Sequence, residues 1–100
     1  MPYICYCKDH PGVRQLRQKH TPAHLDYVET ILDRILVAGP LIDTQSGDYN
    51  ASFLVYQAET QQEALKLLHD DPYYIAGIFA EVHCQQFLPA AGTWIGGKIW

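Results

Sequence analysis

One histidine in this sequence stands where acid–base chemistry is expected. Thr21 and Pro22 come just before His24; Thr is a favoured helix N-cap, and Pro is favoured at the first helical position. A helix that begins at Pro22 would put His24 in its first turn, where the positive end of the helix dipole disfavours the imidazolium ion. A neutral imidazole is ready to accept a proton, so we predict that His24 is a general base or acid. The alternative is a histidine that only fills the edge of an apolar helix face.

Three aspartates are candidates for orienting His24. Asp33 lies nine positions further along the same predicted helix, and nine steps of about 100° leave it half a turn out of phase. Asp26 is two positions from His24 and also faces elsewhere. Asp71 comes from a different element and reaches His24 only through the fold, while its place before Pro72 equally suits a helix N-cap. Both roles stay open for Asp71.

The three cysteines are candidates for a metal site or a disulfide. Cys5 and Cys7 lie two positions apart in a predicted strand, so their side chains point to the same face. Cys84 and His83 could join them around a metal ion. An odd number of cysteines without framework spacing argues against a disulfide scaffold. We therefore interpret the cysteines as small buried hydrophobic residues and expect neither a metal site nor a disulfide.

Two further possibilities concern the N-terminus and cofactors. If Met1 is removed, Pro2 becomes an N-terminal amine, which tautomerases use as a base, so this is a second enzyme hypothesis. No Gly-rich phosphate loop is present, so the sequence implies no nucleotide cofactor. We expect a cofactor-free protein.

The composition limits the class of protein. The chain has 100 residues, the usual size of one domain, with 48% hydrophobic and 18% charged residues. A net charge of -4 without a basic run disfavours nucleic-acid binding. No apolar run approaches the roughly 20 residues that span a bilayer, and the N-terminus lacks the pattern of a signal peptide. We therefore expect a cytoplasmic protein without membrane contact.

The hydrophobic pattern predicts a βαββαβ order in a single domain. Strands are expected over residues 3–7, 35–41, 52–57 and 78–88, and helices over 13–20, from 22 onward, and from 60 through 68. The second helix should carry one apolar stripe made of Leu25, Val28, Leu32 and Ile35. Asp71 and Pro72 end the last long helix and can cap one further turn. This order is typical of a ferredoxin-like α+β fold, with four antiparallel strands and two helices on one face.

The second face of this sheet predicts a partner. Both faces of the predicted strands are apolar, because Cys5 and Cys7 lie on one side of the first strand and Ile4 and Tyr6 on the other. Two helices cover only one face, so we expect a homodimer in which the other face packs against a second copy. Residues 89–100 form a tail with Trp94 and Trp100, which we expect to be ordered as a lid or a dimer arm.

Several short segments together resemble the YCII-related family. They are Arg17, Pro22-Ala23-His24-Leu25, Ala38-Gly39-Pro40, Asp71-Pro72-Tyr73, Ala76-Gly77 and Phe87. The resemblance spans residues 3 to about 88 and implies a ferredoxin-like fold, a dimer, and a site centred on a histidine and an aspartate. Carried onto this sequence, the catalytic residues are His24 and Asp71. The residues expected to bind the substrate are Arg17, Tyr73, Gly39 and Pro40.

The resemblance also implies a function. The wider superfamily of dimeric α/β barrels includes lactone isomerases, and related small proteins remove chloride from chlorinated hydroxyquinols. We therefore expect a cofactor-free isomerase or lyase that acts on a small cyclic or aromatic metabolite; the alternative is a binding or accessory module without catalysis. Thr21, where many relatives have a basic residue, and the long aromatic tail depart from the family pattern, and both bear on the choice of substrate.

Overall fold

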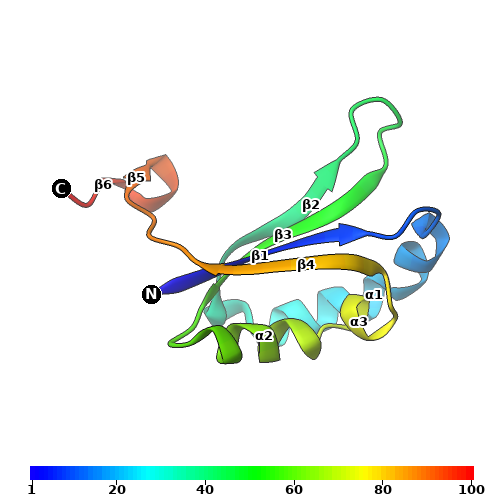
Figure 1. Cartoon of the computed structure of the whole chain (residues 1–100), viewed down its shortest axis with the longest axis horizontal. Helices are drawn as coiled ribbons and strands as arrows, with labels where there is room; N and C mark the ends of the chain where they lie inside the picture. The colour runs from blue at the N-terminus through cyan, green and yellow to red at the C-terminus, as the bar shows by residue number, and fades with distance from the viewer.

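Four antiparallel strands form the sheet, in the order β2-β3-β1-β4 (Figure 1). The computed structural model describes residues 1–100. Its main elements are β1 (Pro2–Asp9), α1 (Arg14–Thr30), the 3-10 helix η1 (Leu32–Arg34), β2 (Ile35–Ile42), β3 (Tyr49–Gln57), α2 (Gln61–His69), α3 (Pro72–Ile75) and β4 (Phe79–Gln86). The three α-helices lie on one side of the sheet (Figure 1). The predicted ferredoxin-like α+β fold is confirmed, and no helix has the length and apolar character needed to cross a bilayer.

The central strands explain where the core lies. Along β1, Cys5 and Cys7 are fully buried and Tyr6 is exposed, which is the alternation of a strand with one covered face. Cys5 pairs with Leu54 of β3, and both belong to the core between sheet and helices. Tyr6 pairs with Phe53 on the opposite face, which no helix covers. We call this second surface the open face.

Helix α1 is continuous through Pro22, so the predicted new helix start at Pro22 is wrong. Thr21 does not cap a helix; its hydroxyl donates a hydrogen bond to the carbonyl oxygen of Arg17 at 2.8 Å. A proline inside a helix removes a backbone hydrogen bond and crowds the preceding turn, and tertiary contacts on both sides of Pro22 offset that local loss. Arg17 bonds to the sheet before it, and His24 and Tyr27 bond to Asp71 and to the Leu67 carbonyl after it. His24 therefore lies in the third turn of α1, too far from the helix N-terminus for the helix dipole to favour a neutral imidazole.

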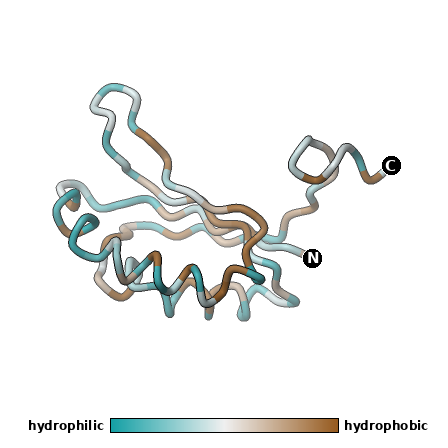
Figure 2. Tube along the Cα trace, turned by 180° about the vertical axis from the view of Figure 1, so that it is seen from behind, coloured by the Kyte–Doolittle hydropathy of each residue, from teal (hydrophilic) through white to brown (hydrophobic).

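The predicted apolar stripe of α1 is also wrong. Leu25 and Leu32 are 54% and 62% exposed, and Leu32 lies beyond the helix in η1. The covered side of the helix carries Arg17, Thr21 and His24 instead, of which Arg17 is buried and the others are half-buried. Figure 2 shows hydrophilic and hydrophobic residues alternating along the helical layer. A helix that turns polar groups toward a sheet must supply each of them with a partner.

The remaining boundaries differ by a few residues. β3 begins at Tyr49 rather than Ser52, and β4 ends at Gln86 rather than Leu88. Asp33 lies in η1, beyond the end of α1 at Thr30, so the predicted half-turn offset from His24 along one helix does not apply. The predicted cap of α2 is confirmed, because the Thr60 side chain accepts a hydrogen bond from the Glu63 amide at 3.1 Å.

The tail forms a small hairpin of its own. It consists of β5 (Ala91–Gly92), η2 (Thr93–Ile95) and β6 (Gly97–Lys98), and it lies on the side of the sheet away from the helices (Figure 1). Trp94 is 84% and Trp100 is 74% exposed, so the burial expected for these indoles does not occur within one chain. Gly96, with φ of 82°, adopts the left-handed conformation that ends η2 and leads into β6.

A stability prediction follows from the core. The Tyr56 side chain is fully buried, its hydroxyl has no hydrogen-bond partner, and burial raises its pKa. An unpaired buried hydroxyl costs about 1–3 kcal/mol, so Tyr56→Phe should leave the free energy of unfolding unchanged or raise it. The measurement is urea denaturation followed by circular dichroism.

Tyr27→Phe is the matched control. The Tyr27 hydroxyl donates to the Leu67 carbonyl at 2.6 Å, so its removal should lower the free energy of unfolding by about 1 kcal/mol. A clear loss of stability in Tyr56→Phe, equal to that of the control, would contradict the assignment of an unpaired hydroxyl.

Candidate active site

Asp71 is the buried anchor of the site. It is the residue before α3, with Pro72 at the first helical position, and only 1% of it is exposed. Its Oδ1 accepts a hydrogen bond from the Tyr73 amide at 2.9 Å, which is the N-cap contact expected from the Asp-Pro pair. The carboxylate thus serves the local backbone, and its remaining lone pairs point toward α1.

His24 meets this carboxylate from α1. Its Nδ1 lies 2.8 Å from Oδ1 and 3.0 Å from Oδ2 of Asp71. A carboxylate only accepts hydrogen bonds, so Nδ1 is the nitrogen that carries the proton. In the neutral ring, a proton on Nδ1 leaves the lone pair on Nε2, which is the geometry of a base oriented by a carboxylate. Capping and orientation are therefore both present in the contacts of Asp71.

Tyr73 forms the floor under the imidazole. Its ring stacks on that of His24 with a centroid separation of 3.9 Å and an interplanar angle of 9°. Its hydroxyl lies 2.8 Å from Oγ1 of Thr21, which comes from the same face of α1 as His24. Tyr73 is buried. The His24 ring is thus held both at its edge, by Asp71, and on one face, by Tyr73.

Arg17 lies one turn before Thr21 and is only 5% exposed. Its Nε donates to Oδ2 of Asp9 at 2.9 Å, and its Nη2 donates to Oγ of Ser52 at 2.6 Å and to the Ala51 carbonyl at 3.1 Å. Its guanidinium carbon lies 4.7 Å from the centre of the Tyr73 ring. Most donors of Arg17 are therefore occupied by the protein itself.

Other predicted residues lie outside this group. Gly39 and Pro40 are exposed on the edge strand β2, and neither makes a hydrogen bond or a stacking contact with His24. An edge strand tolerates the missing amide of Pro40. Pro2, the alternative base, is buried at the start of β1 and pairs with Gln57. Asp33 makes no contact with His24.

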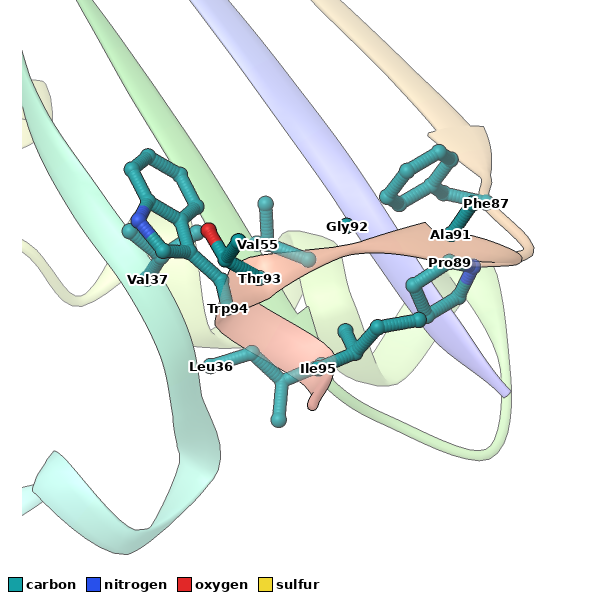
Figure 3. A pocket seen from close by; sticks show the side chains of 10 residues that line it. All are labelled: Leu36, Val37, Val55, Phe87, Pro89, Ala91, Gly92, Thr93, Trp94 and Ile95. Atoms are coloured by element: carbon teal, nitrogen blue, oxygen red, sulfur yellow. The ribbon is translucent and has the colours of Figure 1, made fainter. Parts of the chain in front are cut away.

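Three cavities near the sheet and the tail differ in character. A polar cleft of about 240 Å³ adjoins the site and is lined by Arg14, Arg17, Gln18, Thr21, Gly47, Asp48 and Tyr49. A larger, mainly apolar cavity of about 610 Å³ lies between the tail and the open face, where Trp94 and Val55 face it (Figure 3). A third, polar cleft of about 340 Å³ is lined by residues that include Asp9, His10 and Arg14. The apolar cavity contains no titratable side chain, and the cleft of about 240 Å³ shares Arg17 and Thr21 with the group around His24.

Cys5 and Cys7 are poorly suited to nucleophilic chemistry. Burial raises the pKa of Cys7 to about 12, and the carboxylates of Asp71 and Asp9 add to this effect. Burial also raises the pKa of Cys5, next to Cys84 on the neighbouring strand. The thiolate is the nucleophile and metal ligand, so Cys5 and Cys7 are inert thiols near neutral pH.

The sequence analysis missed two residues of the group. The predicted first strand ends at Cys7, but β1 extends to Asp9, which follows Cys5 and Cys7 on the covered face. Continuing the two-residue alternation by one more step would have placed Asp9 there. No sequence signal points to Ser52, because its partner Arg17 is 35 positions away.

Comparison with known proteins gives the family. A model of the YCII-related domain matches residues 1–88. Among solved structures, the chain is similar to the 5-chloro-2-hydroxyhydroquinone dehydrochlorinase TftG from Burkholderia phenoliruptrix AC1100, in complex with 2,5-dihydroxybenzoquinone. The two share 33% identity, with a TM-score of 0.81 and coverage of 93% of this chain and 97% of TftG.

A second solved structure is more distant. It is a provisionally assigned antibiotic biosynthesis monooxygenase from Chloroflexus aurantiacus J-10-fl, with 15% identity, a TM-score of 0.48 and coverage of 91% of this chain and 95% of that one, and it carries no argument. No match is found among the curated proteins. The family model spans most of the residues, including every member of the group around His24, and the chain therefore belongs to the YCII-related family.

Proposed function

We propose that this protein is a small enzyme that uses His24 and Asp71 for general acid–base chemistry on a small cyclic or aromatic metabolite. The contact between His24 Nδ1 and the buried Asp71 carboxylate, at 2.8 and 3.0 Å, carries this proposal. It orients the ring and directs Nε2 away from the carboxylate, as a proton-transfer catalyst requires. The similarity to TftG, which is named a dehydrochlorinase, supports a lyase.

The reaction that this pair supports begins with removal of a proton from a hydroxyl group or from a carbon beside a carbonyl. In a dehydrochlorination of a chlorinated hydroxyquinol, a hydroxyl proton first moves to the ring carbon that bears chlorine, which turns the neighbouring hydroxyl-bearing carbon into a carbonyl. Nε2 of His24 then takes the proton of a second hydroxyl group, and the electron pair of the broken O–H bond forms a second carbonyl. The ring double bond moves to the chlorine-bearing carbon, and chloride leaves with the electrons of its bond to that carbon. A chlorinated hydroxyquinol that loses one proton and one chloride ion becomes a quinone. Atoms and electrons balance without an external oxidant or reductant.

The polar cleft supports a substrate of small size. Thr21 lines this cleft of about 240 Å³ and also belongs to the group around His24, one helical turn away. The volume lies below the range of about 300–1,000 Å³ that is usual for larger ligands, which favours a single ring. Arg14 and Gln18 line the same cleft and offer donors to hydroxyl or carbonyl oxygens.

The direct test measures chloride release from 5-chloro-2-hydroxyhydroquinone, with related chlorinated phenols and lactones followed by absorbance. His24→Gln should abolish turnover. Asp71→Asn should lower kcat by about 100-fold or more, because the amide would donate to Nδ1 and move the ring proton to Nε2. Asp71→Asn keeps a side-chain oxygen that can cap α3, so its thermal midpoint should stay close to that of wild type.

Asp33→Asn is the matched control, because it makes the same change at a carboxylate that does not contact His24. It should leave kcat unchanged. Normal turnover in Asp71→Asn, or loss of turnover only in Asp33→Asn, would contradict the assigned pair. Tight binding of a ring ligand without turnover, unaltered in His24→Gln, would support a binding module instead.

We also propose that the open face packs against a second copy of the chain. Tyr6 is 38% exposed on this face, and Phe53 and Ile4 lie beside it in the register of β1 and β3. The tail hairpin lies on the same side of the sheet (Figure 1), and the tail carries the exposed Trp94 and Trp100. A two-fold arrangement would cover these apolar groups together.

Light scattering after size exclusion tests the dimer. At micromolar concentration, wild type should have twice the 11.4 kDa mass of one chain, and Tyr6→Asp on the open face should reduce this to one chain. Leu25→Asp, an equal change at an exposed position of α1, is the control and should remain dimeric. A wild-type protein that runs as a monomer would refute the interface.

A further inference from the structure

One face of α1 places three polar residues in a row beneath α3. Arg17, Thr21 and His24 occupy positions i, i+4 and i+7, and all three contact Tyr73 or its hydroxyl. Positions seven apart on a helix are about 10.5 Å apart along its axis. The centre of the Tyr73 ring lies 4.7 Å from the guanidinium carbon of Arg17 and 3.9 Å from the centre of the His24 ring, so both side chains reach it across this separation. The Tyr73 ring therefore lies between the guanidinium and the imidazole.

The hydrogen bonds of Thr21 fix the direction of the Tyr73 hydroxyl. A threonine hydroxyl has one hydrogen, and in Thr21 this hydrogen is donated to the Arg17 carbonyl at 2.8 Å. Oγ1 of Thr21 can then only accept from Tyr73, whose hydroxyl lies 2.8 Å away. The phenolic proton of Tyr73 is therefore committed to Thr21 and is not free to move to a substrate.

The other side of the ring is equally fixed. Arg17 is held by Asp9, Ser52 and the Ala51 carbonyl from strands β1 and β3. Its charge is paired and its guanidinium is buried, so it forms a rigid wall against one face of Tyr73. The ring cannot shift toward Arg17 without breaking these bonds. Its opposite face is the surface on which His24 rests.

We propose that Thr21 and Tyr73 are positioning residues that hold the His24 ring flat, with Thr21 acting through the hydroxyl of Tyr73. Asp71 fixes the edge of the imidazole, and the buttressed Tyr73 ring fixes its plane. Tyr73 is thus not the proton donor of the reaction. The catalytic meaning of this inference rests on the proposed function, while the positioning itself can be measured without a substrate.

The experiment compares Thr21→Val, Tyr73→Phe, the double variant and Thr21→Ser. The first readout is the chemical shift of the His24 ring protons, which the stacked Tyr73 ring displaces. Thr21→Val leaves a buried phenol without an acceptor, so the ring should move and the shift should approach that of an unstacked histidine. Tyr73→Phe and the double variant should keep the wild-type shift, because neither contains a phenolic hydroxyl that lacks a partner. Thr21→Ser should also keep it, because the serine hydroxyl can still accept from Tyr73.

The second readout is kcat and KM for chloride release from 5-chloro-2-hydroxyhydroquinone. Thr21→Val should lower kcat about tenfold, and the double variant should restore kcat. Both variants lose the Thr21 hydroxyl from the cleft, so a change in KM that the two share reports substrate binding, while the recovery of kcat reports the positioning. Loss of turnover in Tyr73→Phe with an intact stack would overturn the inference, because the phenol would then be a proton donor. An unchanged His24 shift in Thr21→Val would also overturn it. If wild type does not turn over this compound, the proposed lyase activity fails, and the shifts still decide the positioning.

Discussion

The burial of the Asp71 carboxylate is the constraint on which the site depends. Only 1% of this residue is exposed, and a buried carboxylate is costly unless donors surround it. The Tyr73 amide and Nδ1 of His24 supply these donors. The hydrogen bond from the Tyr73 amide caps the start of α3, directly after α2. The hydrogen bond from His24 joins α1 to α3. One carboxylate therefore caps a helix, joins two helices and orients the imidazole.

Helix α1 shows how a stable fold accommodates such a site. Its covered face carries Arg17, Thr21 and His24 where an ordinary amphipathic helix would carry apolar residues. Each of these groups has a partner, so the cost of burying them is offset by hydrogen bonds and stacking. The apolar contacts come instead from the sheet and α2, through residues such as Leu54 and Leu68. The covered face of α1 thus carries residues of the candidate site, and the apolar core lies mainly between the sheet and α2.

The sequence predicted the βαββαβ succession of elements and a cap as one of two roles for Asp71, because hydrophobic periodicity and the Asp-Pro pair are local signals. It misplaced the start of the helix before His24, because Thr21-Pro22 has the local pattern of a cap while the hydroxyl of Thr21 serves Arg17 and Tyr73. These contacts depend on tertiary packing, which no local pattern contains. Leu25 was wrongly predicted to face the core for the same reason. Helical periodicity shows which residues share a face of the helix, but not whether that face points toward the sheet or toward solvent.

The central claim is that Asp71 holds His24 with its proton on Nδ1 and its lone pair on Nε2. Long-range ¹H–¹⁵N correlation spectra of the uniformly ¹⁵N-labelled protein test this directly, in buffer alkaline enough for the imidazole to be neutral. Among the signals of the five histidines, those of His24 are identified as the ones missing from the spectrum of His24→Gln. The account predicts a protonated Nδ1 and an unprotonated Nε2 for His24. A protonated Nε2 with an unprotonated Nδ1 would contradict it, because the base would then face the carboxylate rather than the substrate.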